Sequence, residues 1–425
     1  MGKTIASQII TIAIFIISYI LIFSGKIDRA VASLLGLFML LLFGYTFGFL
    51  NFESVLKHVD WEVLLLLFGM MTYVGILAKT GFFKFLGIKA IKMAKGKPWL
   101  IFLYLSLITT FVSMIIDNVT TILLIIPLTV EISEMLEINP IPIMIGEAIL
   151  SNIGGVATMV GDPPNIMIAF ASHYTFNDFL VHLFPPVLAA LLVSIFIARI
   201  VYRKWIRHES KNVEKLMEIN AARYIRNRKR MWQMLYILFG MVFFFALSSY
   251  VKISPAFIAL SGATLALVIT MEEPKEAFKS VEWPTLVFFI GLFSLVGGLE
   301  EVGVLREFAN WIAGLSENVI AIAILILWMS GLSSSFVDNI PIAAAMIPVV
   351  ASLSSHYHTG ILWWALAMGV GMGGNITPIG SSASVITLTL SKRYGHEIHN
   401  KDWLLYGTLT GIASMAVCTL FLFFM

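Results

Sequence analysis

The sequence contains an internal repeat, and this repeat limits the possible folds more than any other feature. Residues of a first block return 222 positions later, with Trp61, Gly69 and Gly81 matched by Trp283, Gly291 and Gly303. A second block, IIDNVTTILLIIP at 115–127, is matched by FVDNIPIAAAMIP at 336–348, and a third, GGVATMVG at 154–161, by GGNITPIG at 373–380. Three blocks in the same order at nearly one spacing indicate that the chain consists of two homologous halves.

Apolar stretches long enough to cross a bilayer recur in both halves, for example at 9–23, 30–50 and 231–250. Only 12% of the residues are charged, about half of the fraction in a soluble domain. The alternating pattern of a transmembrane barrel is absent. The sequence therefore predicts a multi-pass helical protein of the cell (inner) membrane. Its net charge of +3 arises from basic loops, so we expect no nucleic-acid partner.

The distribution of basic residues predicts that the halves cross the membrane in opposite senses. Residues 79–97 carry six lysines and no acid, whereas the matching residues 300–317 carry four glutamates and one arginine. Residues 199–230 hold eleven Lys and Arg against three Glu. Because Lys and Arg are enriched in cytoplasmic loops, the first and third segments are expected inside and the second outside. Such an inverted repeat is typical of secondary transporters.

We therefore expect an all-α polytopic membrane protein, an inverted repeat of two halves, each with five transmembrane spans, one re-entrant hairpin and a broken helix. The first repeat is expected at 1–203, with its hairpin at about 98–136 and its broken span at about 142–170. A basic cytoplasmic linker is expected at 204–230. The second repeat is expected at 231–425, with its hairpin at about 318–355 and its broken span at about 361–390.

The stretch SNIGGVATMVGDPPN at 151–165 is the strongest sign of a functional site. Its glycines and its Pro-Pro pair would break a continuous helix. Irregular backbone at membrane depth survives only where protein or a water-filled cavity surrounds it. Asp162 just before two prolines fits a helix that restarts there. The alternative, a simple loop between two spans, is disfavoured by the aligned glycine-rich stretch in the second half.

Asp117-Asn118 and Asp338-Asn339 fall at the two expected hairpin tips. An ionisable residue within a membrane is a functional candidate, although each Asp or Asn could instead only cap the helix that follows it. Hydroxyl groups on the same elements come from lone threonines, which more often bond to their own helix; they are Thr120, Thr121, Thr158 and Thr377.

Basic residues are absent from the two breaks and the two tips. A multiply charged anion needs cationic partners or many donors. The polar set therefore favours Na⁺, H⁺ or a small neutral hydroxylated solute. The histidines at 58, 173, 182, 356 and 358 are expected in loops, and Trp363-Trp364 at the membrane interface. The only cysteine, Cys418, falls in the last span, so neither a disulfide framework nor a thiolate metal cluster is expected, and no metal site.

At these motifs the sequence resembles the ion transporter superfamily over essentially the whole chain. NIGGVATMVGDPPN resembles the signature of the P protein (pink-eyed-dilution) group, and GNITPIGSSAS, with the DN of the preceding hairpin, resembles bacterial arsenite permeases. Some bacterial sodium/proton antiporters share this scaffold. The carboxylate transporters of the superfamily carry paired Ser-Asn-Thr motifs, which neither hairpin contains.

The resemblance implies a substrate or ion site between the two hairpin tips and the two breaks. In the first half its residues would be Asp117, Asn118, Asn152, Gly154, Gly155, Thr158, Gly161, Asp162 and Asn165, to which the hydroxyl of Thr120 is added. In the second half they would be Asp338, Asn339, Gly373, Gly374, Asn375, Thr377, Gly380, Ser381 and Ser382.

The function expected from this site is secondary active transport by alternating access. The leading hypothesis is efflux of arsenite or antimonite as an uncharged hydroxide, coupled to protons carried by Asp117, Asp162 or Asp338. The alternatives are Na⁺/H⁺ antiport, carboxylate transport and a channel. An intramembrane aspartyl protease is the weakest alternative, so no enzymatic activity is expected.

The expected partners are a small inorganic solute and the lipid bilayer. No cofactor is expected, and the coupling ion would be H⁺ or Na⁺. Transporters of this scaffold are often dimers, which makes a homodimer an expectation. The chain has no ATP-binding motif, so ATP-driven pumping would need a separate ATPase subunit.

Overall fold

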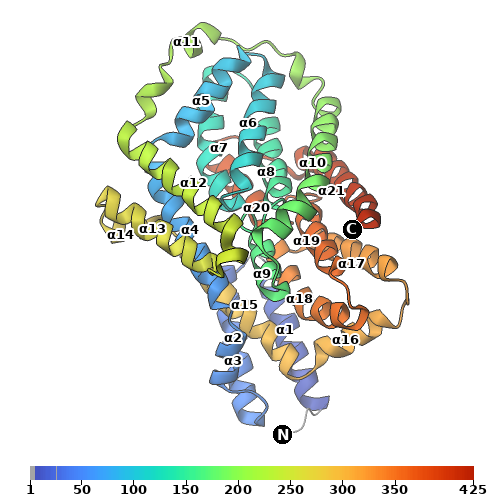
Figure 1. Ribbon diagram of the computed structural model, residues 1–425. Coiled ribbons are helices and arrows are strands. Elements are labelled where there is room, and N and C mark those ends of the chain that lie inside the picture. The colour runs from blue at the N-terminus through green and yellow to red at the C-terminus, as the bar shows by residue number, and fades with distance from the viewer. Residues whose placement is uncertain (1–4, 25) are drawn as a thin grey trace.

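The computed structural model describes residues 5–24 and 26–425, and within these ranges it contains helices and no strands. Ten of the described helices are long and apolar enough to cross a membrane. The fold class expected from the sequence, an all-α polytopic membrane protein with two inverted halves, is confirmed (Figure 1). The limits of the two repeats stay predictions, and residues 1–4 of the expected first repeat lie outside the described part.

The helices of the first half and of the linker follow in chain order. They are α1 (Ile5–Ser24), α2 (Arg29–Phe47), α3 (Phe52–His58), α4 (Trp61–Lys79), α5 (Phe82–Ala94), α6 (Pro98–Ser113), α7 (Asn118–Met135), α8 (Ile141–Gly155), α9 (Pro163–Ser172), α10 (Phe176–Val201), η1 (Trp205–Arg207), α11 (Val213–Glu218) and η2 (Ala221–Tyr224).

The second half repeats this order. Its helices are α12 (Arg228–Val251), α13 (Pro255–Thr270), α14 (Pro274–Ala277), η3 (Phe278–Ser280), α15 (Trp283–Glu301), α16 (Val304–Ala313), α17 (Val319–Phe336), α18 (Asn339–Tyr357), α19 (Ile361–Gly373), α20 (Ser382–Arg393), α21 (Asn400–Phe421) and η4 (Leu422–Phe424).

Equivalent helices of the two halves make equivalent contacts. Helix α2 packs on α15 as α13 packs on α4, and α6 packs on α8 as α17 packs on α19. The two halves also pack against each other, because α7 lies against α20 and α18 lies against α9. Each break in one half is thus packed against a hairpin helix of the other half, which brings all four motifs to one place.

The two ends of the molecule differ in charge. Helix α5 and the linker helix α11 lie at one end of Figure 1, whereas α3 and α16 lie at the other. The linker is attached to the first end, because Lys92 Nζ donates to the Ile219 carbonyl and the Lys211 amide to the Leu136 carbonyl. We call the α5 end the basic end, since its residues 79–97 carry the six lysines, and the α16 end the acidic end.

Each hairpin turns just before an Asp-Asn pair. Asp117 is the N-cap of α7, and its Oδ1 accepts the Thr120 amide at 2.9 Å, which satisfies one of the free N–H groups of the first turn. Asp338 occupies the same position before α18 but makes no such bond. Its side chain is therefore available to other partners.

Each broken span consists of two short helices separated by irregular backbone. Helix α8 ends at Gly155 and α9 begins at Pro163, whereas α19 ends at Gly373 and α20 begins at Ser382. Pro163 stands at the first position of α9, where the missing N–H costs nothing. Three carbonyls at the end of α8 and in the break after it are bound by Asn165, whose Nδ2 donates to the carbonyls of Gly155, Val156 and Thr158.

Two expectations about aromatic side chains were wrong. His182 lies within α10 and not in a loop, and Trp363 and Trp364 are buried and not at an interface. The reason is packing: the Trp364 ring stacks on Tyr174 at 4.5 Å and on His182 at 4.7 Å between ring centroids. His356 likewise lies in the last turn of α18.

Candidate functional site

The two hairpin tips meet at the carboxylate of Asp162. Asn118, the first residue of α7, donates through Nδ2 to Asp162 Oδ1 at 3.1 Å. Asn339, the first residue of α18, donates to Asp162 Oδ2 at 2.9 Å. All three side chains are buried. One carboxylate from the first break is therefore held between the hairpins of both halves.

Asn152 joins this carboxylate to the second break. Its Oδ1 accepts from Asn118 at 3.0 Å, and its Nδ2 donates to Asn375 Oδ1 at 2.9 Å and to Ser381 Oγ at 2.7 Å. The Nδ2 atom of Asn375 is buried without a hydrogen-bond partner. We call the connected set the central polar network; its members are Asn118, Asn152, Asp162, Asn339, Asn375 and Ser381.

The second aspartate, Asp338, has a basic partner that the sequence did not suggest. Arg29 Nη1 lies 3.0 Å from Asp338 Oδ2 and 2.8 Å from Ser382 Oγ, and Ser382 also donates to Asp338. Arg29 Nη2 donates to Thr285 Oγ1 at 3.3 Å, and the guanidinium lies over the Phe288 ring. The inference that the site lacks a cation was wrong, because it considered only the breaks and the tips.

Arg29 comes from the first turn of α2, 309 positions before Asp338. Nothing in its local sequence indicates this contact. It arises because α2 of the first half packs on α15 of the second half. Long-range pairing of this kind is found only when the two halves are folded together.

Several expected ligands have a structural role instead. Thr158 donates to the Met114 carbonyl and Thr377 to the Ser335 carbonyl, so both attach a break to the hairpin of their own half. The Nδ2 group of Asn165 donates to three backbone carbonyls. Asp117 caps its helix, and Thr120 beside it lines a cavity described below.

The glycines of the breaks allow the hairpin backbone to come close. A Cβ on Gly154 would lie 2.4 Å from the Thr110 carbonyl oxygen, and one on Gly373 would lie 2.1 Å from that of Gly331. Gly161 and Gly380 likewise face a hairpin carbonyl, whereas Gly155 and Gly374 face a carbonyl of their own break. These positions shape the site and offer no side chain to it.

A cavity of about 710 Å³ opens beside the first hairpin at the basic end. We call it the basic vestibule. Its lining includes Thr120 of α7, the acidic Glu282, and five basic residues: Lys79, Lys84, Arg223, Arg226 and Lys279. Burial raises the pKa of Glu282, the charge of Asp117 raises it further, and Arg29 lowers it. Glu282 thus links the vestibule electrostatically to both tip regions.

In the equivalent region at the acidic end, a histidine of α3 packs against α15. Gly75 of α4 faces Ser280 across the vestibule wall, whereas its equivalent Gly297 faces His58. The His58 ring contacts Glu301 at 3.2 Å and Glu300 at 3.7 Å. A small serine at one end and a histidine in contact with two glutamates at the other make the two ends of the molecule structurally different.

Glu147 is a buried carboxylate that the sequence reasoning did not single out. It lies in the middle of α8, fully buried, five residues before Asn152. The signal was present, because an acid inside the apolar stretch 141–153 is itself a functional candidate.

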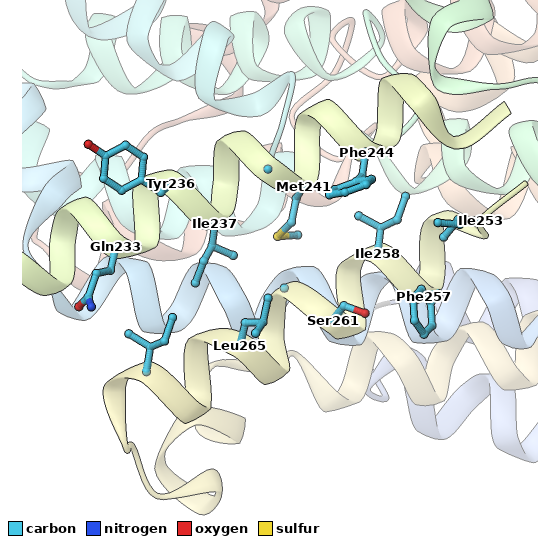
Figure 2. A pocket seen from close by; sticks show the side chains of 13 residues that line it. Gln233, Tyr236, Ile237, Met241, Phe244, Ile253, Phe257, Ile258, Ser261 and Leu265 are labelled. Carbon is cyan, nitrogen blue, oxygen red and sulfur yellow. The ribbon is translucent and has the colours of Figure 1, made fainter. Parts of the chain in front are cut away.

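An apolar pocket of about 550 Å³ lies between α12 and α13 and is not the candidate site (Figure 2). Gln233 and Ser261 are its most polar side chains, and no acid or base lines it. The central polar network lies on other helices.

The inverted repeat of apolar helices around a buried polar network defines the class of the protein as a multi-pass membrane transporter. The chain belongs to the citrate transporter family (CitMHS), whose family profile matches residues 19–369.

The relatives extend over nearly the whole chain. The 46 kDa membrane protein of Mycobacterium leprae (strain TN) is 36% identical over 424 residues, 98% of each chain. An uncharacterized transporter of Mycobacterium tuberculosis (strain ATCC 25618 / H37Rv) is 36% identical over 420 residues, 98% of each chain. The P protein of Homo sapiens is 30% identical over 472 residues, covering 91% of this chain and 56% of that protein. The resemblance to the P protein is therefore confirmed, whereas those to arsenite permeases and sodium/proton antiporters stay predictions.

A solved structure supports the fold. The crystal structure of the Alcanivorax borkumensis YdaH transporter matches with a TM-score of 0.59 at 12% sequence identity, covering 93% of this chain and 98% of that one. At this identity the match concerns the fold alone.

Proposed function

We propose that the protein is a proton-coupled secondary transporter of a small carboxylate anion, with Asp162 as the coupling group. The observation that carries this proposal is the Asp162 carboxylate, which is buried, held by the amides of two hairpins and paired with no basic residue of the described chain. An ionised carboxylate in such surroundings is costly unless it is compensated. A proton is the smallest compensation available.

The coupling follows from charge. An anion that binds in the central polar network meets Asp162, and two negative charges at short range repel strongly in a medium of low dielectric constant. Protonation of Asp162 removes this repulsion and frees the amides of Asn118 and Asn339 to donate to the anion. The anion and the proton therefore bind together, and movement of the α6–α10 and α17–α21 bundle would carry both across the membrane.

Arg29 and the basic vestibule support a carboxylate over an uncharged solute. Arg29 supplies a fixed positive charge beside Ser382. Arg223 and Arg226 of the vestibule form no ion pair with any described residue, so their charge is available to attract an anion. The citrate transporter description of the family profile agrees with this class of substrate.

The hypothesis of arsenite or antimonite efflux is the second candidate. It is favoured by the neutral amides and hydroxyls of the central polar network, which suit an uncharged hydroxide. The buried Cys418 lies in α21 and offers no thiolate to arsenic at the network. An aspartyl protease is not supported, because Asp338 is bound by Arg29 and, among the described residues, no hydrogen bond joins it to Asp162 as in a carboxylate dyad.

Proteoliposomes with an entrapped pH dye distinguish these candidates. Citrate, succinate, arsenite and Na⁺ would each be offered under an imposed pH gradient. We expect proton movement with at least one carboxylate and accumulation of that radiolabelled carboxylate. Glu137→Gln, which alters an exposed carboxylate paired with Lys211, is the matched control and should transport normally. Proton movement with arsenite alone or with Na⁺ alone would replace the proposal by the corresponding alternative.

A further inference from the structure

A second carboxylate, Glu147, lies on the same broken span as Asp162 and has no role in the site described above. Its Oε1 accepts a hydrogen bond from the hydroxyl of Thr129 at 2.5 Å, and its Oε2 is buried and has no partner among the residues that the structure describes. Its equivalent in the second half is the apolar Leu366. Both carboxylates of the broken spans therefore belong to the first half.

No ionisable group compensates Glu147 within the described chain. Helix α8 packs against α6, α7, α10, α19, α20 and α21. The ionisable residues of these helices, with the C-cap residue of α10 added, are Tyr104 on α6, Glu131 and Glu134 on α7, Asp178, His182 and Arg199 on α10, Tyr202 at the C-cap of α10, Lys392 and Arg393 on α20, and Lys401, Asp402, Tyr406 and Cys418 on α21. None of them hydrogen-bonds or ion-pairs with Glu147, whose one described partner is Thr129.

Two helices that pack on α8 carry buried hydroxyl groups without a partner among the described residues. Ser133 is one helical turn from Thr129 on α7, and its Oγ is buried without a partner. The Oγ of Ser106 on α6 is also unpartnered, and it lies 3.1 Å from the position of a Cβ on Gly146, the residue before Glu147. A buried hydroxyl is usually hydrogen-bonded, so two buried hydroxyls and a carboxylate oxygen that are all unpartnered among the described residues, on the packed helices α6, α7 and α8, are unusual.

Two hydroxyl residues of α7 lie between Glu147 and the basic end. Thr129 and Ser133 follow α7 toward its last residue, Met135, and the Leu136 carbonyl just beyond accepts the amide of Lys211 in the linker. In the other direction, Glu147 and Asn152 share α8 and are separated by about 7.5 Å along its axis. The Glu147 carboxylate thus lies between the central polar network and the linker surface.

We propose that Glu147 is a second proton-binding site, which exchanges its proton with the basic end along the seam of α7 and α8. A neutral carboxylic acid fits the single hydroxyl partner, Thr129, and the apolar surroundings, and the hydroxyls of Thr129 and Ser133 lie on α7 between this carboxyl group and the basic end. The role of this site in transport rests on the proposed function, because Glu147 would add a second proton to the one carried by Asp162 in each transport cycle.

Infrared difference spectroscopy of the purified protein in lipid nanodiscs tests the site without any substrate. We expect a C=O stretch of a buried carboxylic acid that disappears as the pH is raised and that is absent in Glu147→Gln. Thr129→Val should keep the band and shift it to higher frequency, because a hydrogen bond is removed. Glu137→Gln should leave it unchanged.

The transport readout is separate. With the carboxylate that moves protons in the wild type as the probe, Glu147→Gln should lower the number of protons per anion by one. A band that is absent, or that stays constant over the whole pH range, would overturn the inference while leaving Asp162 as the coupling group. A band that titrates in a protein that moves no carboxylate would keep the proton site and overturn the proposed function.

Discussion

The two broken spans have one architecture and different charges. In each half a threonine of the break donates to a carbonyl of the hairpin, Thr158 in the first and Thr377 in the second. In each half a serine of the hairpin donates back to the span, Ser113 to the Ser151 carbonyl and Ser334 to the Val370 carbonyl. These shared hydrogen bonds fix the position of each hairpin relative to the broken span of its own half.

The differences lie where the breaks face each other. Asp162 of the first break corresponds to Ser381 of the second, and both are in the central polar network. At the hairpin tips both halves carry an aspartate, but the two have different partners: Asp117 caps its own helix, whereas Asp338 binds Arg29. The two halves therefore share their backbone arrangement but differ in charge. As a result the site contains one carboxylate without a basic partner in the described chain, Asp162, and one that is paired with an arginine, Asp338.

The largest effect is expected from the unpaired carboxylate. Asp162→Asn keeps the shape and the hydrogen-bonding capacity but cannot exchange a proton, so proton-driven uptake of the carboxylate should fall at least about 100-fold, or about 2.8 kcal/mol. Exchange of labelled for unlabelled substrate without a gradient should persist, because the neutral amide mimics the protonated acid.

Ser381→Ala is the symmetric control. It removes the hydrogen bond to Asn152 and the two bonds to Ser384 that cap α20, but no charge, so it should weaken substrate binding by less than about tenfold and leave coupling intact. Coupled uptake by Asp162→Asn, measured with the pH dye in proteoliposomes, would show that the asymmetry of the breaks is not the basis of coupling.

The next effect concerns the paired carboxylate. Arg29→Met leaves Asp338 with Ser382 as its one described partner, and breaking such a pair should lower carboxylate affinity by about tenfold or more. The double variant Arg29→Met with Asp338→Asn removes both charges and should recover the folding but not the affinity. Thermal unfolding and substrate binding of the three proteins separate these two roles.

Affinity that the double variant restores in full would mean that Arg29 only neutralises Asp338. In that case its positive charge does not act on the substrate, and the argument for an anion from this residue would be lost.

The comparison also shows why the sequence revealed one part of the site and not another. The repeat blocks and the glycine-rich breaks are local patterns, so Asn118, Asp162 and Asn339 were found from sequence and do lie together. Arg29 was missed because its contact depends on the packing of α2 on α15, which no local pattern encodes. Glu147 was overlooked although its signal was local, since the search was restricted to breaks and tips.

Some residues were correctly located but differ in role. Thr158 and Thr377 lie in the breaks and Asn165 in the first turn of α9, yet their hydroxyl and amide donors bind backbone carbonyls. Sequence places a polar residue near a site, but only the structure shows whether its hydrogen bonds are already made.

A smaller effect, on stability, is expected where the breaks are most tightly packed. A Cβ on Gly161 would lie 2.5 Å from the Ser113 carbonyl oxygen, and one on Gly380 would lie 2.8 Å from that of Ser334. Gly161→Ala should therefore destabilise the protein by about 3 kcal/mol and Gly380→Ala by less, since overpacking costs about 1–3 kcal/mol. The measurement is the thermal midpoint of the detergent-purified protein.

Gly240→Ala is the control for this pair, because no atom lies within 4 Å of a Cβ at that position of α12. It should leave stability unchanged or raise it by up to about 1 kcal/mol through helix propensity. Equal midpoints for all three variants would show that close backbone approach does not confine the breaks.

The smallest effect tests whether the shared bonds are equivalent. Thr158→Val and Thr377→Val each remove one hydroxyl from a hairpin carbonyl, Met114 in the first half and Ser335 in the second. Each loss should cost about 1 kcal/mol. Thr158 is buried and Thr377 is partly exposed, so water can replace the second bond better and its loss should cost slightly less. Thermal midpoints that fall far more for Thr377→Val than for Thr158→Val would indicate that the second break, and not the first, is the one held mainly by its hairpin.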